Sequence, residues 1–177
     1  MTDYGVVIMR AQPFHNGHNS IIQQIIRDGR KPIIILGGAN VHDDRHPLNV
    51  ATRSALIELV YPDNQVIVRA INDSDDWDVW YQSLYDYVLP TNGTFTIYGH
   101  VKPEDRITFV CKDRIFTNST YLDIFELDGI PIEYISTYTD NSGTTVSATT
   151  IRTNEQYAIE HLDARIYTTL KEIGWWK

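Results

Sequence analysis

Two histidines three residues apart offer the clearest chemistry in this chain. His15 and His18 belong to the segment RAQPFHNGH (10–18), which directly follows a continuous apolar run at 4–9. At this spacing, two side chains in the first turn of a helix can face one point. Two imidazoles that donate hydrogen bonds to that point would stabilise the charge that develops on a phosphoryl group during its transfer.

The turn that carries the histidines also suits an anion. Gly17 leaves the backbone open to close approach, and a helix N-terminus offers free N–H groups and the positive end of a dipole. Arg10 stands just before this turn. An H-x-G-H string also arises by chance in polar surface turns, but its position between a buried strand and a helix start favours a functional site.

Composition narrows the function classes. The net charge of −8 argues against a nucleic-acid partner and requires any phosphate site to gather its cations locally. Cys111 is the only cysteine, which excludes an internal disulfide, and we interpret it as a small apolar filler. The short apolar N-terminal stretch predicts neither a signal nor a membrane span, so we expect a cytoplasmic protein.

The elements that must position these residues alternate between strand and helix. Buried strands are predicted at 4–9, 32–38, 65–71, 94–99 and 130–136, and helices at 18–28, 51–60, 75–89 and 155–173. Between them, ITFVC within 106–130 favours a strand of a hairpin, and NSTYLDIF a short helix. This order predicts an α/β fold with a Rossmann-like doubly wound parallel sheet and helices on both faces, in a single domain spanning 1–177. Ligands bind such sheets at the carboxyl ends of the strands.

A family resemblance rests on two spaced motifs. RAQPFHNGH resembles the G-R-F-Q-P-F-H-x-G-H opening of archaeal-type nicotinamide-nucleotide adenylyltransferases, in the H-x-G-H nucleotidyltransferase superfamily. Met9 and Ala11 depart from that opening, and Met9 could narrow the approach to the nucleotide. VSATTIR (146–152) is similar to the family's I-S-[SA]-T-x-I-R. The segment 101–130 matches least and is expected to be a local insertion.

The resemblance implies a nucleotidyltransferase that moves AMP from ATP to nicotinamide mononucleotide (NMN), forming NAD and pyrophosphate. It also implies Mg²⁺ as a cofactor that is bound mainly by the ATP phosphates. The sequence leaves the oligomeric state undecided, and a homo-oligomer is possible because relatives commonly form one. The implied catalytic residues are Arg10, His15, His18 and Arg152. The implied ATP-binding residues are Gln12, Pro13, Phe14, Gly17, Gly99, His100, Ser147, Thr149 and Thr150. The implied NMN-binding residues are Asn40, Arg45, Arg53, Trp77 and Trp80.

Several residues leave alternatives open. Tryptophans at helical spacing are more often core than ligand platform, and Trp80 is favoured over Trp77 for stacking on the cationic nicotinamide. Lys102 is either a phosphate contact or a solvated lysine, and His161 is interpreted as surface or packing. The run 42–46 holds histidines and aspartates, but no second segment completes a metal site, so none is expected.

Helix caps and alternative functions are also predicted. Ser147 stands where it could cap the helix that follows it, and Asp73 or Ser74 could cap the third helix. Trp175 and Trp176 suggest docking onto the body or onto another subunit. Two other functions stay open: AMP or CMP transfer to phosphopantetheine or a polyol phosphate, and a non-catalytic nucleotide-binding sensor.

Overall fold

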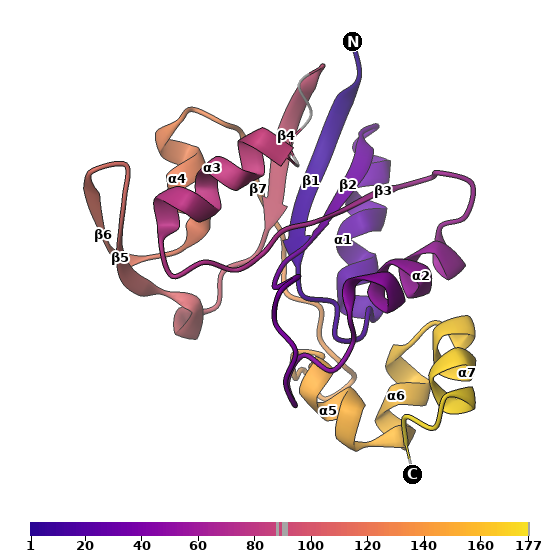
Figure 1. Ribbon diagram of the computed structural model, residues 1–177. Coiled ribbons are helices and arrows are strands. Elements are labelled where there is room, and N and C mark those ends of the chain that lie inside the picture. The colour runs from indigo at the N-terminus through magenta and orange to yellow at the C-terminus, as the bar shows by residue number, and fades with distance from the viewer. Residues whose placement is uncertain (88, 90–91, 177) are drawn as a thin grey trace.

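A parallel sheet runs through the centre of the molecule (Figure 1). The computed structural model describes residues 1–87, 89 and 92–176, and within them the sheet has five strands in the order β3-β2-β1-β4-β7. The strands are β1 Asp3–Met9, β2 Lys31–Leu36, β3 Ile67–Ala70, β4 Thr94–Gly99 and β7 Ile132–Tyr134. Strand addition reverses direction between β1 and β4, which is the switch point beside which doubly wound folds bind ligands. The predicted fold class is confirmed.

Helices cover both faces of this sheet. The helices are α1 Asn16–Arg27, α2 Val50–Val60, α3 Trp77–Tyr87, α4 Tyr121–Leu127, α5 Ala148–Thr153, α6 Glu155–His161 and α7 Ala164–Glu172. Helices α1 and α2 pack on one face, α3 and α4 on the other, and α5 lies beyond the carboxyl ends of the strands (Figure 1). None of the helices in the described ranges is long and apolar enough to cross a bilayer.

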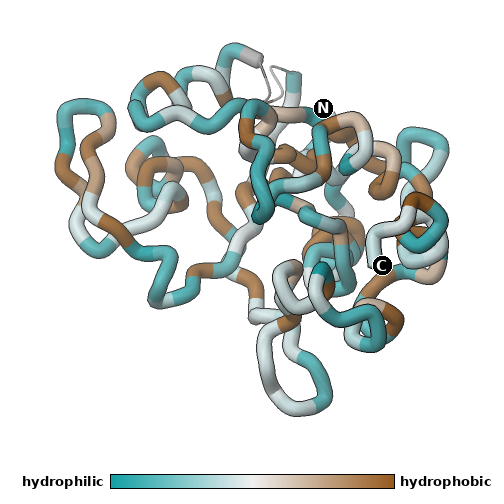
Figure 2. Tube along the Cα trace, turned by 60° about the horizontal axis from the view of Figure 1, so that its bottom comes forward, coloured by the Kyte–Doolittle hydropathy of each residue, from teal (hydrophilic) through white to brown (hydrophobic). Residues whose placement is uncertain are grey.

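Side chains of the strands pack into two separate hydrophobic cores, one on each face of the sheet. Side chains alternate between the faces of a strand, so Ile33 and Ile35 join α3 and α4 while Ile34 and Leu36 join α1 and α2. Figure 2 shows hydrophobic stretches along the strands and hydrophilic ones along the outer turns. The continuous apolar runs of the sequence therefore serve both faces of the sheet at once, as a buried parallel strand requires.

The closing helix differs from its prediction over 155–173. The structure breaks it into α6 and α7, because Leu162 is extended and the Asp163 side chain caps α7 by accepting a hydrogen bond from Arg165 N. The break rotates the two halves relative to one another. Ile159, predicted on the buried stripe, is consequently exposed, whereas Ile166 and Leu170 are buried.

The third helix begins later than predicted, at Trp77. Its cap is Asp76, whose Oδ1 accepts hydrogen bonds from Asp78 N and Val79 N, so neither Asp73 nor Ser74 caps it. Residue 88, inside the predicted span 75–89, lies outside the described residues.

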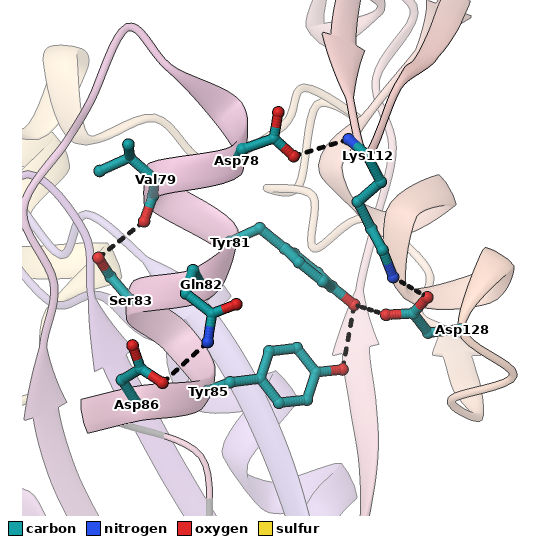
Figure 3. Close-up of a pocket in the computed structure, with 9 residues that line it drawn as sticks. All are labelled: Asp78, Val79, Tyr81, Gln82, Ser83, Tyr85, Asp86, Lys112 and Asp128. Atoms are coloured by element: carbon teal, nitrogen blue, oxygen red, sulfur yellow. Dashed lines mark hydrogen bonds and ion pairs between the residues drawn. The ribbon is translucent and has the colours of Figure 1, made fainter.

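The segment 101–130 contains the 3₁₀ turn η1 Pro103–Asp105, the antiparallel hairpin β5 Ile107–Cys111 with β6 Arg114–Ser119, and α4. A polar network fastens the hairpin to α3 (Figure 3). Asp78 accepts a hydrogen bond from Lys112 N at 2.7 Å, the Lys112 ammonium pairs with Asp128, and Tyr81 donates to Asp128 at 2.7 Å. Cys111 is buried beside it, in agreement with an apolar filler.

The contact of β1 with α1 generates the first prediction. A Cβ on Gly5 would overlap Ile25 Cγ2 and lie 2.9 Å from Ile25 Cγ1. Gly5→Ala should therefore lower the free energy of unfolding by about 1–3 kcal/mol, as overpacking does. Urea denaturation measures this change.

The matched control is the double variant. Ile25→Ala alone opens a cavity and should cost about 2–5 kcal/mol, and the methyl group of Gly5→Ala should fill part of that space. The double variant should consequently lose less unfolding free energy than the two single variants lose when their losses are added. Strict additivity would show that the two residues are not in steric conflict.

Candidate functional site

His15 and His18 cap the helix that they begin. His15 is the N-cap of α1, and its Nδ1 accepts a hydrogen bond from Gly17 N at 3.1 Å. In return, Nδ1 of His18 accepts from His15 N at 3.3 Å. Because each Nδ1 acts as an acceptor, the proton of each neutral ring is assigned to Nε2. Both rings therefore hold an N–H group ready to donate.

The two rings are neutral at physiological pH. Burial, and then the electrostatic influence of His161 and Lys102, lower the pKa of His15 to about 3. Burial, and then His15, His100 and Lys102, lower the pKa of His18 well below its usual value. The rings stack with centroids 3.8 Å apart, a distance at which two imidazolium cations would repel strongly. His18, which lines a cavity on each side of it, can thus polarise a phosphoryl group as a hydrogen-bond donor without carrying charge, whereas His15 is in the lining of neither cavity.

Three neighbours in the same turn support the rings. A Cβ on Gly17 would lie 2.8 Å from His15 Cε1, so the missing side chain makes room for the imidazole. Phe14 is 1% exposed and stacks 5.7 Å from His18. Pro13 is also buried. The predicted ATP contacts of the Pro13 and Phe14 side chains are therefore closed off in this structure, and both form the floor of the turn.

One cavity, of about 380 Å³, adjoins the histidine pair and is here called the arginine cavity. Its lining comprises Arg10, Ala11, Gln12, His18, Arg45, His46, Ala148, Thr149 and Arg152. Arg152 Nη1 donates to Gln12 O at 2.8 Å, and Nη2 donates to Thr149 Oγ1 at 3.2 Å. Burial, and then the nearby Arg45, lower the pKa of Arg152. The two distant motifs of the sequence, 10–18 and 146–152, meet at this cavity, whose guanidinium groups suit phosphate oxygens.

A second cavity, of about 610 Å³, lies on the other side of Arg10 and His18 and is here called the aromatic cavity. Its aromatic lining consists of Trp77 and Trp80 of α3 and Tyr121 of α4. Its polar lining includes Asp73, Ser74, Asp75, Gly99, His100, Asp105 and Thr120. Because Arg10 and His18 line both cavities, a ligand group in either one can reach the same imidazole.

The two tryptophans stand in different surroundings. Trp77 stacks on Phe109 of the hairpin at 4.3 Å, and Trp80 meets Trp77 and Tyr121 nearly perpendicularly, at 5.6 and 5.9 Å. Both side chains are half-buried. The segment 101–130 thus builds part of this wall, through Phe109 and Tyr121. The choice between the two tryptophans for stacking stays a prediction.

Arg10 crosses the ends of the strands to reach Asp73, with Nη2 2.7 Å from Oδ2. It passes over Gly38, where φ is +62° and a side chain would collide with the guanidinium group. Gly38 is therefore required twice, for its left-handed backbone and for its missing Cβ. Asp73 follows β3 at the carboxyl edge of the sheet, a position that could have marked it as a site residue in the sequence.

Three predicted ligand contacts make hydrogen bonds to the backbone, and burial corrects the prediction for one of them, Arg53. Arg53 is 1% exposed and donates through Nη1 to Arg10 O and Gly37 O, both at 2.8 Å. Gln12, also buried, exchanges two 2.9 Å hydrogen bonds with the backbone of Leu48. Asn40 exchanges two with the backbone of Asp73. All three side chains hold the strand ends in place; Arg53 is sealed from any ligand, whereas Gln12 also lines the arginine cavity and Asn40 is exposed.

The start of α5 is partly as predicted. Ser147 occupies the predicted N-cap position, but its side chain makes no hydrogen bond to the helix. The predicted position is therefore confirmed and the predicted capping hydrogen bond is wrong. Thr149 lines the arginine cavity, whereas Thr150 is not part of its lining. Trp176 docks on the chain's own body by donating through Nε1 to Ile151 O at 3.0 Å, which ties α5, and with it Arg152, to the residues after α7.

The structure shows the surroundings of His161 and Lys102, for which the sequence left two interpretations each. His161 is buried, packs on Tyr157 at 4.3 Å, and has no hydrogen-bond partner at either ring nitrogen among the described residues. Lys102 lies close enough to lower the pKa values of His15, His18 and His100. Spacing in the sequence could not have placed either residue, because both approach the histidine pair from separate elements.

Comparisons with known proteins bear on the family and the fold of this chain. The model of a family described as Cytidylyltransferase-like matches residues 10–154. A nicotinamide-nucleotide adenylyltransferase of Methanocorpusculum labreanum is 39% identical over 54 residues, which span 30% of this chain and 32% of that protein.

Solved structures share the fold. A bifunctional NMN adenylyltransferase/ADP ribose pyrophosphatase from Francisella tularensis, complexed with AMP and a manganese ion, aligns with a TM-score of 0.71 at 21% identity, over 98% of this chain and 49% of that one. Nicotinic acid mononucleotide adenylyltransferase of Plasmodium falciparum, complexed with APC, aligns with a TM-score of 0.57 at 7% identity, over 98% and 96%. The chain spans about a third of the curated relative and about half of the Francisella protein.

The lowered pKa of His15 generates the second prediction. Between pH about 6.5 and 3, His15 of the unfolded chain binds a proton that the folded protein excludes. Falling pH in this window therefore destabilises the fold, by up to about 1.4 kcal/mol per pH unit for one proton. His15→Asn keeps an acceptor for Gly17 N and removes the proton site, so its unfolding free energy should fall less steeply.

Urea denaturation at intervals from pH 6.5 to 4 measures both slopes. His42→Asn, on an exposed loop, is the matched histidine control and should retain the wild-type slope. Identical slopes for wild type and His15→Asn would mean that His15 is not buried in its neutral form.

Proposed function

Because this chain belongs to the Cytidylyltransferase-like family, we propose that it transfers AMP from ATP to nicotinamide mononucleotide, releasing NAD and pyrophosphate. The observation that carries the proposal is the position of His18 and Arg10 in the shared lining of two cavities. The arginine cavity suits a polyphosphate, and the aromatic cavity suits a flat cationic ring. A transferable phosphoryl group would sit between them, beside the histidine.

The reaction asks little of the protein in covalent chemistry. An oxygen of the mononucleotide 5′-phosphate attacks the α-phosphorus of ATP and forms the new P–O bond, while the bond from that phosphorus to the bridging oxygen breaks. Pyrophosphate departs with the electron pair. The nucleophile is already an anion at neutral pH, so no general base is required. Catalysis then rests on positioning and on charge stabilisation.

The described residues divide this work among them. His18 donates from Nε2 to an oxygen of the α-phosphate, and His15, stacked behind it, is the second proposed donor. Arg152 receives the β- and γ-phosphates in the arginine cavity, with Thr149 at its edge. Arg45, which the family resemblance assigned to the mononucleotide, is reassigned in this proposal to the same phosphates because it lines this cavity. Arg10 bridges the two cavities and exchanges its Asp73 partner for phosphate oxygens when substrate binds.

The remaining contacts follow from the lining. Gly99 and His100, at the end of β4, lie against the aromatic cavity, where backbone and imidazole can reach the nucleotide. Trp77 and Trp80 offer the stacking surface for the pyridinium ring. Mg²⁺ enters as part of the Mg–ATP substrate, bound mainly to phosphate oxygens, which accords with the preference of this ion for phosphates and water over a protein cage.

An acceptor panel tests the proposal. Purified protein with ATP and Mg²⁺ is supplied in turn with nicotinamide mononucleotide, phosphopantetheine and glycerol phosphate, and pyrophosphate release is measured together with the product. The proposal expects NAD and pyrophosphate in equal amounts, from the mononucleotide alone. Pyrophosphate release with another acceptor, or NAD binding without pyrophosphate production, would overturn it.

The third prediction concerns His18. His18→Ala removes one donor to the developing charge and should lower kcat by on the order of 10²–10³-fold, the range for a single such donor. Steady-state kinetics with both substrates saturating measure the change. His42→Ala, a histidine outside the lining of either cavity, should keep the wild-type rate. A well-folded His18→Ala protein with full turnover would remove His18 from the mechanism.

The fourth prediction concerns the hairpin's part in the aromatic wall. Phe109→Leu keeps an apolar side chain but loses the 4.3 Å stack on Trp77. The KM for the mononucleotide should rise several-fold while the KM for ATP stays unchanged, because ground-state binding of one substrate alone is weakened. Ile115→Leu, at an exposed position of the same hairpin, is the control. An equal rise in both KM values would contradict a specific role at the acceptor.

A further inference from the structure

Charge is divided unevenly between the two cavities. The aromatic cavity presents three carboxylates, those of Asp73, Asp75 and Asp105, and among its described lining residues the guanidinium of Arg10 is the permanent cation. That guanidinium lies 2.7 Å from Asp73. Asp75 and Asp105, beside the aromatic side chains, take part in no ion pair among the described residues.

The histidines of the aromatic cavity do not offset these carboxylates. Burial is the main cause that lowers the pKa values of His18 and His100, so both are neutral at physiological pH. The ammonium of Lys102 acts on both of these rings and on His15, but Lys102 is among the described lining residues of neither cavity. Arg45 and Arg152 belong to the arginine cavity. Cations thus gather where phosphates are proposed to bind, and carboxylates gather where the base is proposed to bind.

Asp105 is held against the aromatic wall. Its Oδ2 accepts a hydrogen bond from Lys102 N at 3.3 Å across the turn η1. After burial, the charge of Asp105 is the next cause that raises the pKa of Tyr121, so the carboxylate acts directly on that ring. Asp75 lines the same cavity from the segment before α3, beside Trp77.

We infer that Asp75 and Asp105 make the aromatic cavity select the amide form of the mononucleotide against the acid form. The inference rests on the proposed function and deepens it. A nicotinamide ring joined to ribose is a cation with a neutral amide, and the two carboxylates attract it. The nicotinic acid ring carries an additional carboxylate, which cancels the ring charge and faces like charge in the cavity. Like-charge juxtaposition is an effective source of discrimination.

The expected size of the discrimination follows from the solvent exposure of the two carboxylates. Asp75 and Asp105 are both exposed to solvent, so water and salt screen their fields and the discrimination is far below that of a dry site. We expect kcat/KM for nicotinamide mononucleotide to exceed that for nicotinic acid mononucleotide by about tenfold at low ionic strength. The ratio should shrink as salt is added.

The experiment measures both kcat/KM values for wild type and for the double variant Asp75→Asn with Asp105→Asn. Asparagine keeps the shape, and its Oδ1 can still accept from Lys102 N. The ratio should fall to about two or less in the double variant, mainly through faster use of the acid form. Glu58→Gln, an equal loss of charge on the exposed side of α2, should leave the wild-type ratio unchanged.

The outcomes separate the two proposals. Release of pyrophosphate from neither mononucleotide would sink the proposed function itself. Release from both at equal efficiency in the wild type would leave that function standing and overturn the selection. A tenfold preference that persists in the double variant would also overturn the inference, because the discrimination would then arise from contacts other than these two carboxylates.

Discussion

Two backbone N–H groups determine where the protons of the histidine pair reside, and the rest of the site depends on this. Gly17 N and His15 N occupy the two Nδ1 atoms, so each neutral ring carries its remaining proton at Nε2. Burial keeps the rings uncharged. A helix start normally leaves its first N–H groups without partners; here those same groups fix the tautomers of two side chains at the junction of two cavities.

Polar side chains at the strand ends, two of them buried, hold this junction in place. Arg53 clamps the carbonyl oxygens that follow β1 and β2, Gln12 ties the histidine turn to Leu48, and Asn40 ties the end of β2 to that of β3. Each of these contacts satisfies backbone groups that a strand leaves unpaired at its end. The result is a rigid edge from which Arg10 can extend across Gly38.

The periodicity of apolar residues was sufficient to predict the parallel sheet. From that sheet it followed that the two motifs lie close together at the carboxyl ends of the strands. Apolar runs predicted the strands, and the recognition of a nucleotidyltransferase from the segments 10–18 and 146–152 is confirmed by the family match over 10–154. Periodicity could not reveal the break at Leu162, because the apolar spacing continues across it and only the Asp163 cap ends the helix.

Residue type also could not distinguish a ligand contact from a structural one. Arg53 and Arg152 look alike in sequence, since both are arginines near a helix start. One is sealed beneath the strand ends, and the other lines the arginine cavity. The difference depends on the tertiary contacts of each arginine. The local sequence pattern contains no information about these contacts. For the same reason Tyr121 and Asp105, from the least matched segment, were missed.

The clustered guanidinium groups have a thermodynamic consequence. Arg53 lies beneath Arg10 and Arg152 lies beside Arg45, and in each pair the neighbour's charge, after burial, makes the proton harder to hold. In the proposed function, the phosphates of a bound nucleotide would lie among these cations and offset their mutual repulsion. A ligand that binds only the native form raises its stability by mass action. If nucleotide binds as proposed, the free energy of unfolding therefore rises with the nucleotide concentration.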